Sequence, residues 1–134
     1  MKQVNVHFRS FAGGVKFVKI YNATIENCDR GVVIRYEEMD DNGLTKTEVQ
    51  IIDGDFVTVK RIGIFSNELH FKLGYKFSGE YITPYGKVSV EAFTRELKIE
   101  WEGEYPTVLA KYKSSLMGEV TENEFYLKVK GVNV

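Results

Sequence analysis

The chain has 134 residues, of which 43% are hydrophobic and 28% are charged, a composition typical of a folded globular domain rather than a disordered chain. Its 18 basic and 19 acidic residues give a formal net charge of −1 and are spread along the whole chain. Binding a phosphate backbone needs a concentrated basic face, so we expect no nucleic-acid partner. Cys28 is the only cysteine, which excludes an intrachain disulfide.

The N-terminal segment carries no targeting signal that the sequence reveals. Residues 1–10 alternate polar and apolar side chains and contain no apolar core of the kind found in signal peptides. No apolar run approaches the length of roughly 18 residues that a membrane span requires. The sequence therefore predicts a cytoplasmic protein with no membrane partner.

Alternation of apolar and polar residues with a period of two predicts β-strands along most of the chain. In chain order the alternating stretches lie at residues 4–8, 32–36, 49–51, 69–73, 88–92 and 125–129. Turn signals separate them at residues 13–14, 29–31, 40–43, 53–54, 66–67, 102–103 and 122–123. No stretch has helical periodicity, and the alternation indicates an antiparallel sheet with one dry and one wet face.

About eight to ten short sequential strands with one dry face are expected to close on themselves, because an open meander leaves two exposed edges. We therefore predict an all-β fold over residues 1–134, formed by a single antiparallel up-and-down β-barrel. A two-sheet β-sandwich is the alternative.

The segment from residue 82 to residue 101 interrupts this rhythm twice. Pro84 and Gly86 suit the second and fourth positions of a type I turn. The dry face then includes Thr94 but resumes at Leu97, so the parity shifts by one residue and predicts a β-bulge near Arg95. We expect the Thr94 hydroxyl to satisfy backbone groups that this bulge leaves unpaired.

Several short segments together resemble the YwiB-like family of small uncharacterised bacterial proteins. They are "RYEEMDDNG", "KRIG", "ITPYG" followed by "KVSVEAFT", and "LAKYK", and the resemblance extends in order from about residue 4 to residue 131. The family implies a calycin-type, lipocalin-like β-barrel, in agreement with the alternation pattern. It implies no established activity and therefore supplies no catalytic residues.

Two departures from better-known barrels of this type prevent a ligand class from being borrowed. Lipocalins carry a Gly-x-Trp near the first strand, whereas the only tryptophan here is Trp101. Intracellular fatty-acid carriers use an Arg-x-Tyr in their last strands, and the final stretch "EFYLKVKG" contains no arginine.

Alternation predicts which polar residues share the dry face of the strands. These residues are Tyr36, Glu38, Arg61, Thr94 and Tyr112. A guanidinium inside an apolar barrel is costly unless it is paired, and Glu38 is the nearest inward carboxylate. We predict a polar cluster around Arg61 in the lumen that orients a small amphipathic or anionic ligand. The alternative is a barrel filled by its own side chains, with Arg61 and Glu38 at its rim.

The remaining candidates are weaker. Tyr85 could form a lid over the barrel mouth, whereas His7 and His70 fall on the wet face and are interpreted as surface residues. The sequence contains no ligand spacing for zinc or calcium, so we expect no metal and no cofactor.

Three classes of function stay open. The first is small-molecule binding in the lumen. The second is a protein-interaction module with a filled barrel and an outer aromatic patch that includes Phe93, Trp101 or Tyr126. An enzyme with an inward Arg/Tyr site ranks third, because no nucleophile, base or metal set is evident; we lean against enzymatic activity. A homodimer is compatible with the sequence.

Overall fold

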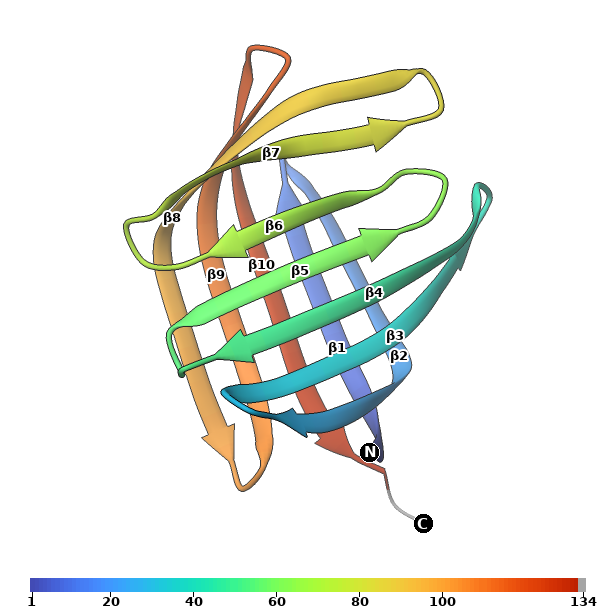
Figure 1. Ribbon diagram of the computed structural model, residues 1–134, viewed down its shortest axis with the longest axis vertical. Coiled ribbons are helices and arrows are strands. Elements are labelled where there is room, and N and C mark those ends of the chain that lie inside the picture. Colours follow the sequence, from blue (N-terminus) through green and yellow to red (C-terminus); the bar gives the residue numbers. More distant parts are fainter. Residues whose placement is uncertain (133–134) are drawn as a thin grey trace.

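The computed structural model describes residues 1–132, which form ten antiparallel strands in one nearly closed barrel (Figure 1). The strands are β1 (Lys2–Ala12), β2 (Val15–Cys28), β3 (Gly31–Asp40), β4 (Gly43–Ile52), β5 (Phe56–Ile62), β6 (Asn67–Phe71), β7 (Lys76–Thr83), β8 (Gly86–Glu102), β9 (Tyr105–Leu116) and β10 (Glu119–Gly131). No helix occurs among these residues, and hence none that could cross a membrane. The predicted all-β, up-and-down fold is confirmed.

All ten strands belong to one sheet in the order β6-β5-β4-β3-β2-β1-β10-β9-β8-β7. The two outer strands approach each other at a single bridge, where the backbone N–H groups of Ser66 and Ile82 each donate to the other residue's carbonyl, at 2.9 and 2.8 Å. Figure 1 shows β3 to β7 crossing in front of β8, β9, β10, β1 and β2. The sheet therefore curves back on itself, and the sandwich alternative is not adopted.

The dry face of the sheet packs a core at one end of the barrel. Because successive side chains of a strand point to opposite faces, every second residue of each strand points into the barrel. The fully buried members include Val6, Ile34, Val49, Ile51 and Leu127. Most of the core belongs to the strand halves next to the β2–β3, β4–β5 and β8–β9 hairpins. The opposite end carries the more polar side chains.

The predicted bulge is confirmed, since the register of β8 against β9 shifts between Thr94 and Glu96. The role expected for the Thr94 hydroxyl is wrong. The backbone N–H of Thr94 donates to the Tyr75 carbonyl at 3.2 Å, and the Thr94 carbonyl accepts from the Gly74 N–H at 3.0 Å. The backbone groups of Thr94, beside the bulge, are thus hydrogen-bonded by the turn that follows β6. The buried Thr94 Oγ1 has no hydrogen-bond partner within residues 1–132.

The β7–β8 hairpin has the predicted turn. Thr83 Oγ1 donates to the Gly86 carbonyl at 2.9 Å and accepts from the Tyr85 N–H at 3.1 Å. Gly86 has a φ of 129°, a conformation that favours glycine.

The turn predicted at residues 122–123 is wrong. The β9–β10 hairpin turns at Met117 and Gly118, both of which have positive φ. Residues 122–123 lie inside β10, because hydrogen bonding to β9 continues past them and outweighs the turn preference of Asn123.

We predict that Thr94→Val raises the free energy of unfolding by about 1 kcal/mol, because it removes a buried hydroxyl that lacks a partner while keeping the side-chain shape. Urea unfolding of both proteins measures the difference. Thr107→Val, at a half-buried position on β9, is the control for strand propensity and should change stability little. A loss of stability in Thr94→Val would contradict the prediction and indicate that the hydroxyl is hydrogen-bonded.

Candidate functional site

A cavity of about 470 Å³ lies at the end of the barrel opposite the packed core. It is bounded by the β1–β2, β3–β4 and β5–β6 hairpins, and we call this end the mouth. Its deeper wall is aromatic: the Phe71 ring lies 4.7 Å from that of Tyr112 and 5.8 Å from that of Phe125, and Phe8 lies 5.4 Å from Phe125 between ring centroids. The lumen is therefore filled at one end and hollow at the other.

An ion pair between Arg61 and Glu38 crosses the cavity wall. Glu38 lies on β3 and Arg61 on β5, and both face inward because they share parity with the buried residues Tyr36 and Val59. The Glu38 side chain is 11% exposed and the Arg61 side chain 45%. The carboxylate is thus nearly buried, unlike the rim position of the alternative, whereas the guanidinium that it holds reaches the mouth, as that alternative expected of Arg61.

The electrostatics favour the charged form of Arg61. Burial alone would lower the pKa of Arg61, but the charge of Glu38 and the hydrogen bond to it outweigh this effect, and the pKa is raised. Without Arg61, Glu38 would be a nearly buried carboxylate lacking a cation, an arrangement that proteins disfavour.

Tyr21 belongs to the site and was not predicted. Its ring stacks on that of Tyr36 with centroids 4.8 Å apart and planes inclined by 21°. Burial raises the pKa of Tyr21, and the neighbouring Glu38 carboxylate raises it further. The signal was present, since Tyr21 shares parity with the buried Ala23 and Ile25. It was obscured because Val18 and Ile20 place apolar side chains on the outer face of the same strand.

The structure brings together four of the five predicted residues: Tyr36, Glu38, Arg61 and Tyr112 all line the cavity. Burial raises the pKa of Tyr36 and raises that of Tyr112 to about 12. Thr94 is the exception. It faces inward and is fully buried beside Tyr112 in the neighbouring strand, but it does not line the cavity.

Tyr85 is 95% exposed at the tip of the β7–β8 hairpin and does not line the cavity, so this arrangement gives no support for a lid. His7 and His70 lie half-buried on the outer face, and His70 Nε2 is 3.0 Å from Glu68 Oε2. Among residues 1–132 no group of three or more His, Cys, Asp or Glu side chains is arranged to hold a metal ion.

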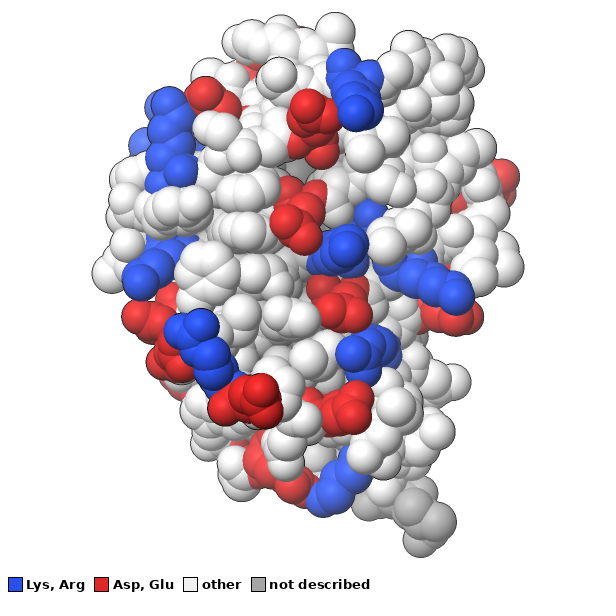
Figure 2. Space-filling view, viewed as in Figure 1, with Lys and Arg blue, Asp and Glu red and all other residues white. Residues whose placement is uncertain are grey.

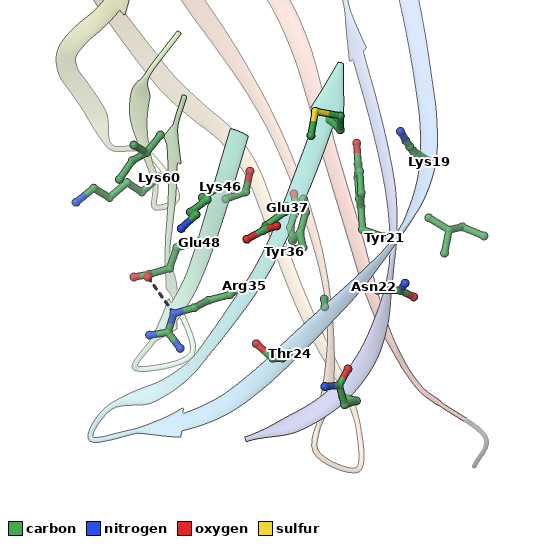
Figure 3. Close-up of a pocket in the computed structure, with 16 residues that line it drawn as sticks. Lys19, Tyr21, Asn22, Thr24, Arg35, Tyr36, Glu37, Lys46, Glu48 and Lys60 are labelled. Atoms are coloured by element: carbon green, nitrogen blue, oxygen red, sulfur yellow. Dashed lines mark hydrogen bonds and ion pairs between the residues drawn. The ribbon is translucent and has the colours of Figure 1, made fainter. Parts of the chain in front are cut away.

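A second hollow, which we call the outer groove, has a volume of about 830 Å³ and lies over the outside of β2 to β5 (Figure 3). The β2–β3 ladder extends only from Ala23 paired with Tyr36 to Cys28 paired with Gly31. Towards the mouth the two strands diverge, as Figure 3 shows. Both hollows are lined by Lys19, Tyr21, Tyr36 and Met39, so they meet at this gap in the wall.

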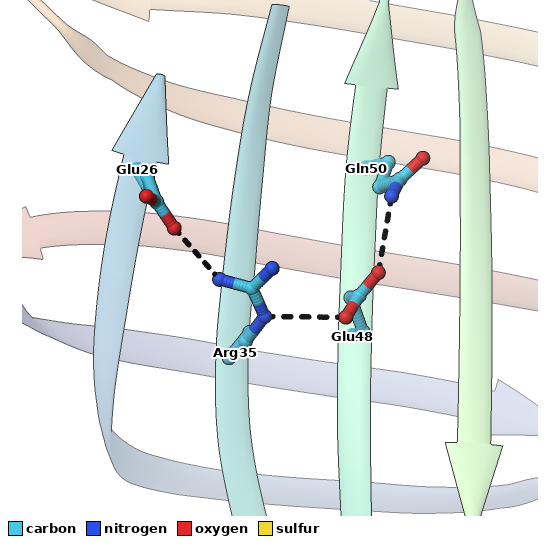
Figure 4. A network of polar contacts seen from close by, with 4 residues as sticks. All are labelled: Glu26, Arg35, Glu48 and Gln50. Carbon is cyan, nitrogen blue, oxygen red and sulfur yellow. Dashed lines mark hydrogen bonds and ion pairs between the residues drawn. The ribbon is translucent and has the colours of Figure 1, made fainter. Parts of the chain in front are cut away.

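Polar contacts stabilise the paired end of these strands. Arg35 donates to Glu26 Oε2 at 3.0 Å and to Glu48 Oε2 at 3.2 Å, and Gln50 donates to Glu48 Oε1 at 3.0 Å (Figure 4). Such exposed pairs contribute little individually, but this network joins three neighbouring strands. On the face seen in Figure 2, basic and acidic side chains are interspersed.

Comparisons with known proteins identify related sequences and folds. The family model described as "Domain of unknown function (DUF1934)" matches residues 13–127. The crystal structure of the ywiB protein from Bacillus subtilis matches with a TM-score of 0.83, covering 98% of this chain and 93% of that chain, at 19% sequence identity. At this identity the likeness shows the fold alone. The comparison with curated proteins finds no match.

We predict that the protein loses stability in alkaline solution as its buried tyrosines must ionise on unfolding. The pKa of Tyr112 rises from 10.0 to about 12 on folding, so its contribution is complete below pH 10 and disappears as the pH rises to about 12. The slope is up to about 1.4 kcal/mol per pH unit for each such tyrosine. Thermal melting across this range measures it.

Tyr112→Phe should flatten this slope, whereas Tyr85→Phe, at an exposed position, should leave it unchanged. Equal slopes in the wild type and in Tyr112→Phe would show that Tyr112 ionises as readily in the folded as in the unfolded chain.

Proposed function

Because this chain belongs to the DUF1934 family of YwiB-like proteins, whose description assigns no activity, we propose from the geometry of the cavity that it binds a small amphipathic molecule in the barrel mouth. The observation that carries the proposal is the buried Glu38 carboxylate, which fixes the Arg61 guanidinium above an aromatic wall. A volume of about 470 Å³ lies within the range of small-molecule sites, which combine an apolar wall with a few polar groups that fix orientation.

The apolar part of the ligand would lie against Phe8, Phe71 and Phe125. These rings belong to β1, β6 and β10 and pack edge-to-face or tilted against one another. Aromatic side chains present large apolar surfaces with few rotatable bonds, so binding against them costs little side-chain entropy. A planar ring or a short acyl chain suits this wall.

The polar head of the ligand would face Arg61. Only its Nη2 is engaged by Glu38, and a guanidinium carries five N–H donors in a fixed fork. The remaining donors are available to an oxygen acceptor. Lys19 adds a second cation to the lining, whereas Asp40 and Glu124 add two carboxylates. This balance favours a head group that is neutral or carries one negative charge over a multiply charged anion.

We predict that anilinonaphthalene sulfonate, which combines an aromatic body with one anionic group, binds the folded protein and gains fluorescence. Arg61→Ala should weaken this binding by about tenfold to a hundredfold, because charge-assisted hydrogen bonds contribute roughly 1.5–3 kcal/mol. Fluorescence titration gives the affinity, and thermal melting establishes that each variant is folded.

Arg35→Ala is the matched control, because Arg35 is similarly exposed and also ion-paired but lies outside the cavity. It should leave probe affinity within twofold. If Arg61→Ala is folded and binds the probe as tightly as the wild type, the lumen site is wrong. Native mass spectrometry of freshly purified protein then reports whether a natural small molecule co-purifies.

A further inference from the structure

The gap in the barrel wall exposes two strand edges, and the proposed lumen site uses some of their side chains but not their free backbone groups. Residues 15–22 of β2 pair with β1 on one side, and the ladder to β3 begins only at Ala23. Residues 37–40 of β3 pair with β4 and not with β2. Backbone N–H and C=O groups along such an edge are available to an additional strand.

The outer groove beside this edge combines apolar and basic side chains. Ile20, Met39 and Ile62 line it and are largely exposed. Three lysines also line it: Lys19 on β2, Lys46 on β4 and Lys60 on β5 (Figure 3).

None of these lysines forms an ion pair within residues 1–132. Arg35, by contrast, is already paired with Glu26 and Glu48. Glu37 and Glu48 also line the groove and lie opposite Lys46 and Lys60 in the ladders. Its four basic and two acidic side chains leave the groove with a net positive charge on a chain whose formal net charge is −1.

We propose that the outer groove binds an extended acidic peptide segment of another protein, which adds as a strand to the free edge of β2. Main-chain hydrogen bonds to residues 15–22 would supply affinity, as in other cases of strand addition. Alternate side chains of the added strand point to opposite faces. Carboxylates on one face would reach Lys46 and Lys60, and apolar side chains on the other would cover the gap beside Tyr21 and Tyr36.

Charge argues for a different partner rather than a second copy of this chain. A two-fold pairing of β2 with its own copy would bring together Lys16 and Lys19 of both chains, with no carboxylate in residues 15–22 of either chain. Like charges across a strand pair are destabilising, and lysines on strand edges commonly prevent edge-to-edge pairing. An acidic strand turns the same lysines into attractive contacts.

The test uses the full chain and two fluorescent peptides about eight residues long, matching the free edge of β2. One alternates valine with glutamate, and the other alternates valine with lysine. Anisotropy titration should show saturable binding of the glutamate peptide only. Hydrogen exchange should show that this peptide slows exchange of alternate amides within residues 15–22, since the other amides already bond to β1.

The double substitution Lys46→Gln with Lys60→Gln should lower the affinity for the glutamate peptide by about tenfold, because two ionic contacts are lost. Lys113→Gln with Lys130→Gln is the matched control, because both lysines are exposed and lie on β9 and β10, away from the groove. This control should leave peptide affinity within twofold. Neither pair of substitutions touches the cavity, so probe binding at Arg61 should persist in both variants.

Several outcomes would overturn the proposal. The first three are equal affinity of the two peptides, equal loss of affinity in the two double variants, and unchanged hydrogen exchange at residues 15–22. A fourth is that anilinonaphthalene sulfonate displaces the glutamate peptide and that only Arg61→Ala loses affinity for the peptide, which would place the peptide in the lumen. The fifth is a dimer that protects residues 15–22 from exchange without any peptide.

Discussion

The alternation of side chains around a nearly closed sheet is the constraint on which the other features depend. It places Val6, Ile34 and Leu127 in a dry interior at one end of the barrel. At the other end the same parity forces Glu38 and Arg61 inward. A charge in that position is tolerated only with a partner, so the ion pair follows from the pleat of the sheet. The hollow beside the pair is bounded by aromatic rings on its deeper side and by polar side chains towards the mouth.

Within residues 1–132 the ladders show one register shift, at the bulge in β8, and it links separate parts of the barrel. Before the bulge the even-numbered residues of β8, such as Thr94, point inward, and after it the odd-numbered ones, such as Leu97, do so. The bulge thus keeps apolar side chains inside along both halves of the strand. Its backbone bonds to the turn at Gly74 and Tyr75, which joins the end of β6 to the middle of β8. One added residue thus lets β8, a strand of 17 residues, bend so that its first half pairs with β7 and most of its length pairs with β9.

Much of this arrangement was predictable because it depends on local periodicity. The inward positions of Tyr36, Arg61 and Tyr112 follow from counting by two, as does the bulge. What depends on distant partners was not predictable. The turn expected at Asn123 lies inside a strand because β9 extends alongside it. The place where β2 and β3 part depends on the curvature of the whole sheet, and therefore the gap, the outer groove and the stacking of Tyr21 on Tyr36 had no local signature.

The seam between β6 and β7 has a mechanical consequence. Within residues 1–132 the ladder pairing between those two strands is limited to the bridge of Ser66, just before β6, with Ile82. The β2–β3 ladder on the opposite side of β3 to β6 is six residue pairs long. The sheet formed by β3 to β6 is thus attached to the remaining six strands by these two short borders and by the hydrogen bonds of Gly74 and Tyr75 to Thr94. Local opening of the barrel is therefore expected to begin along these borders, while the longer ladders stay intact.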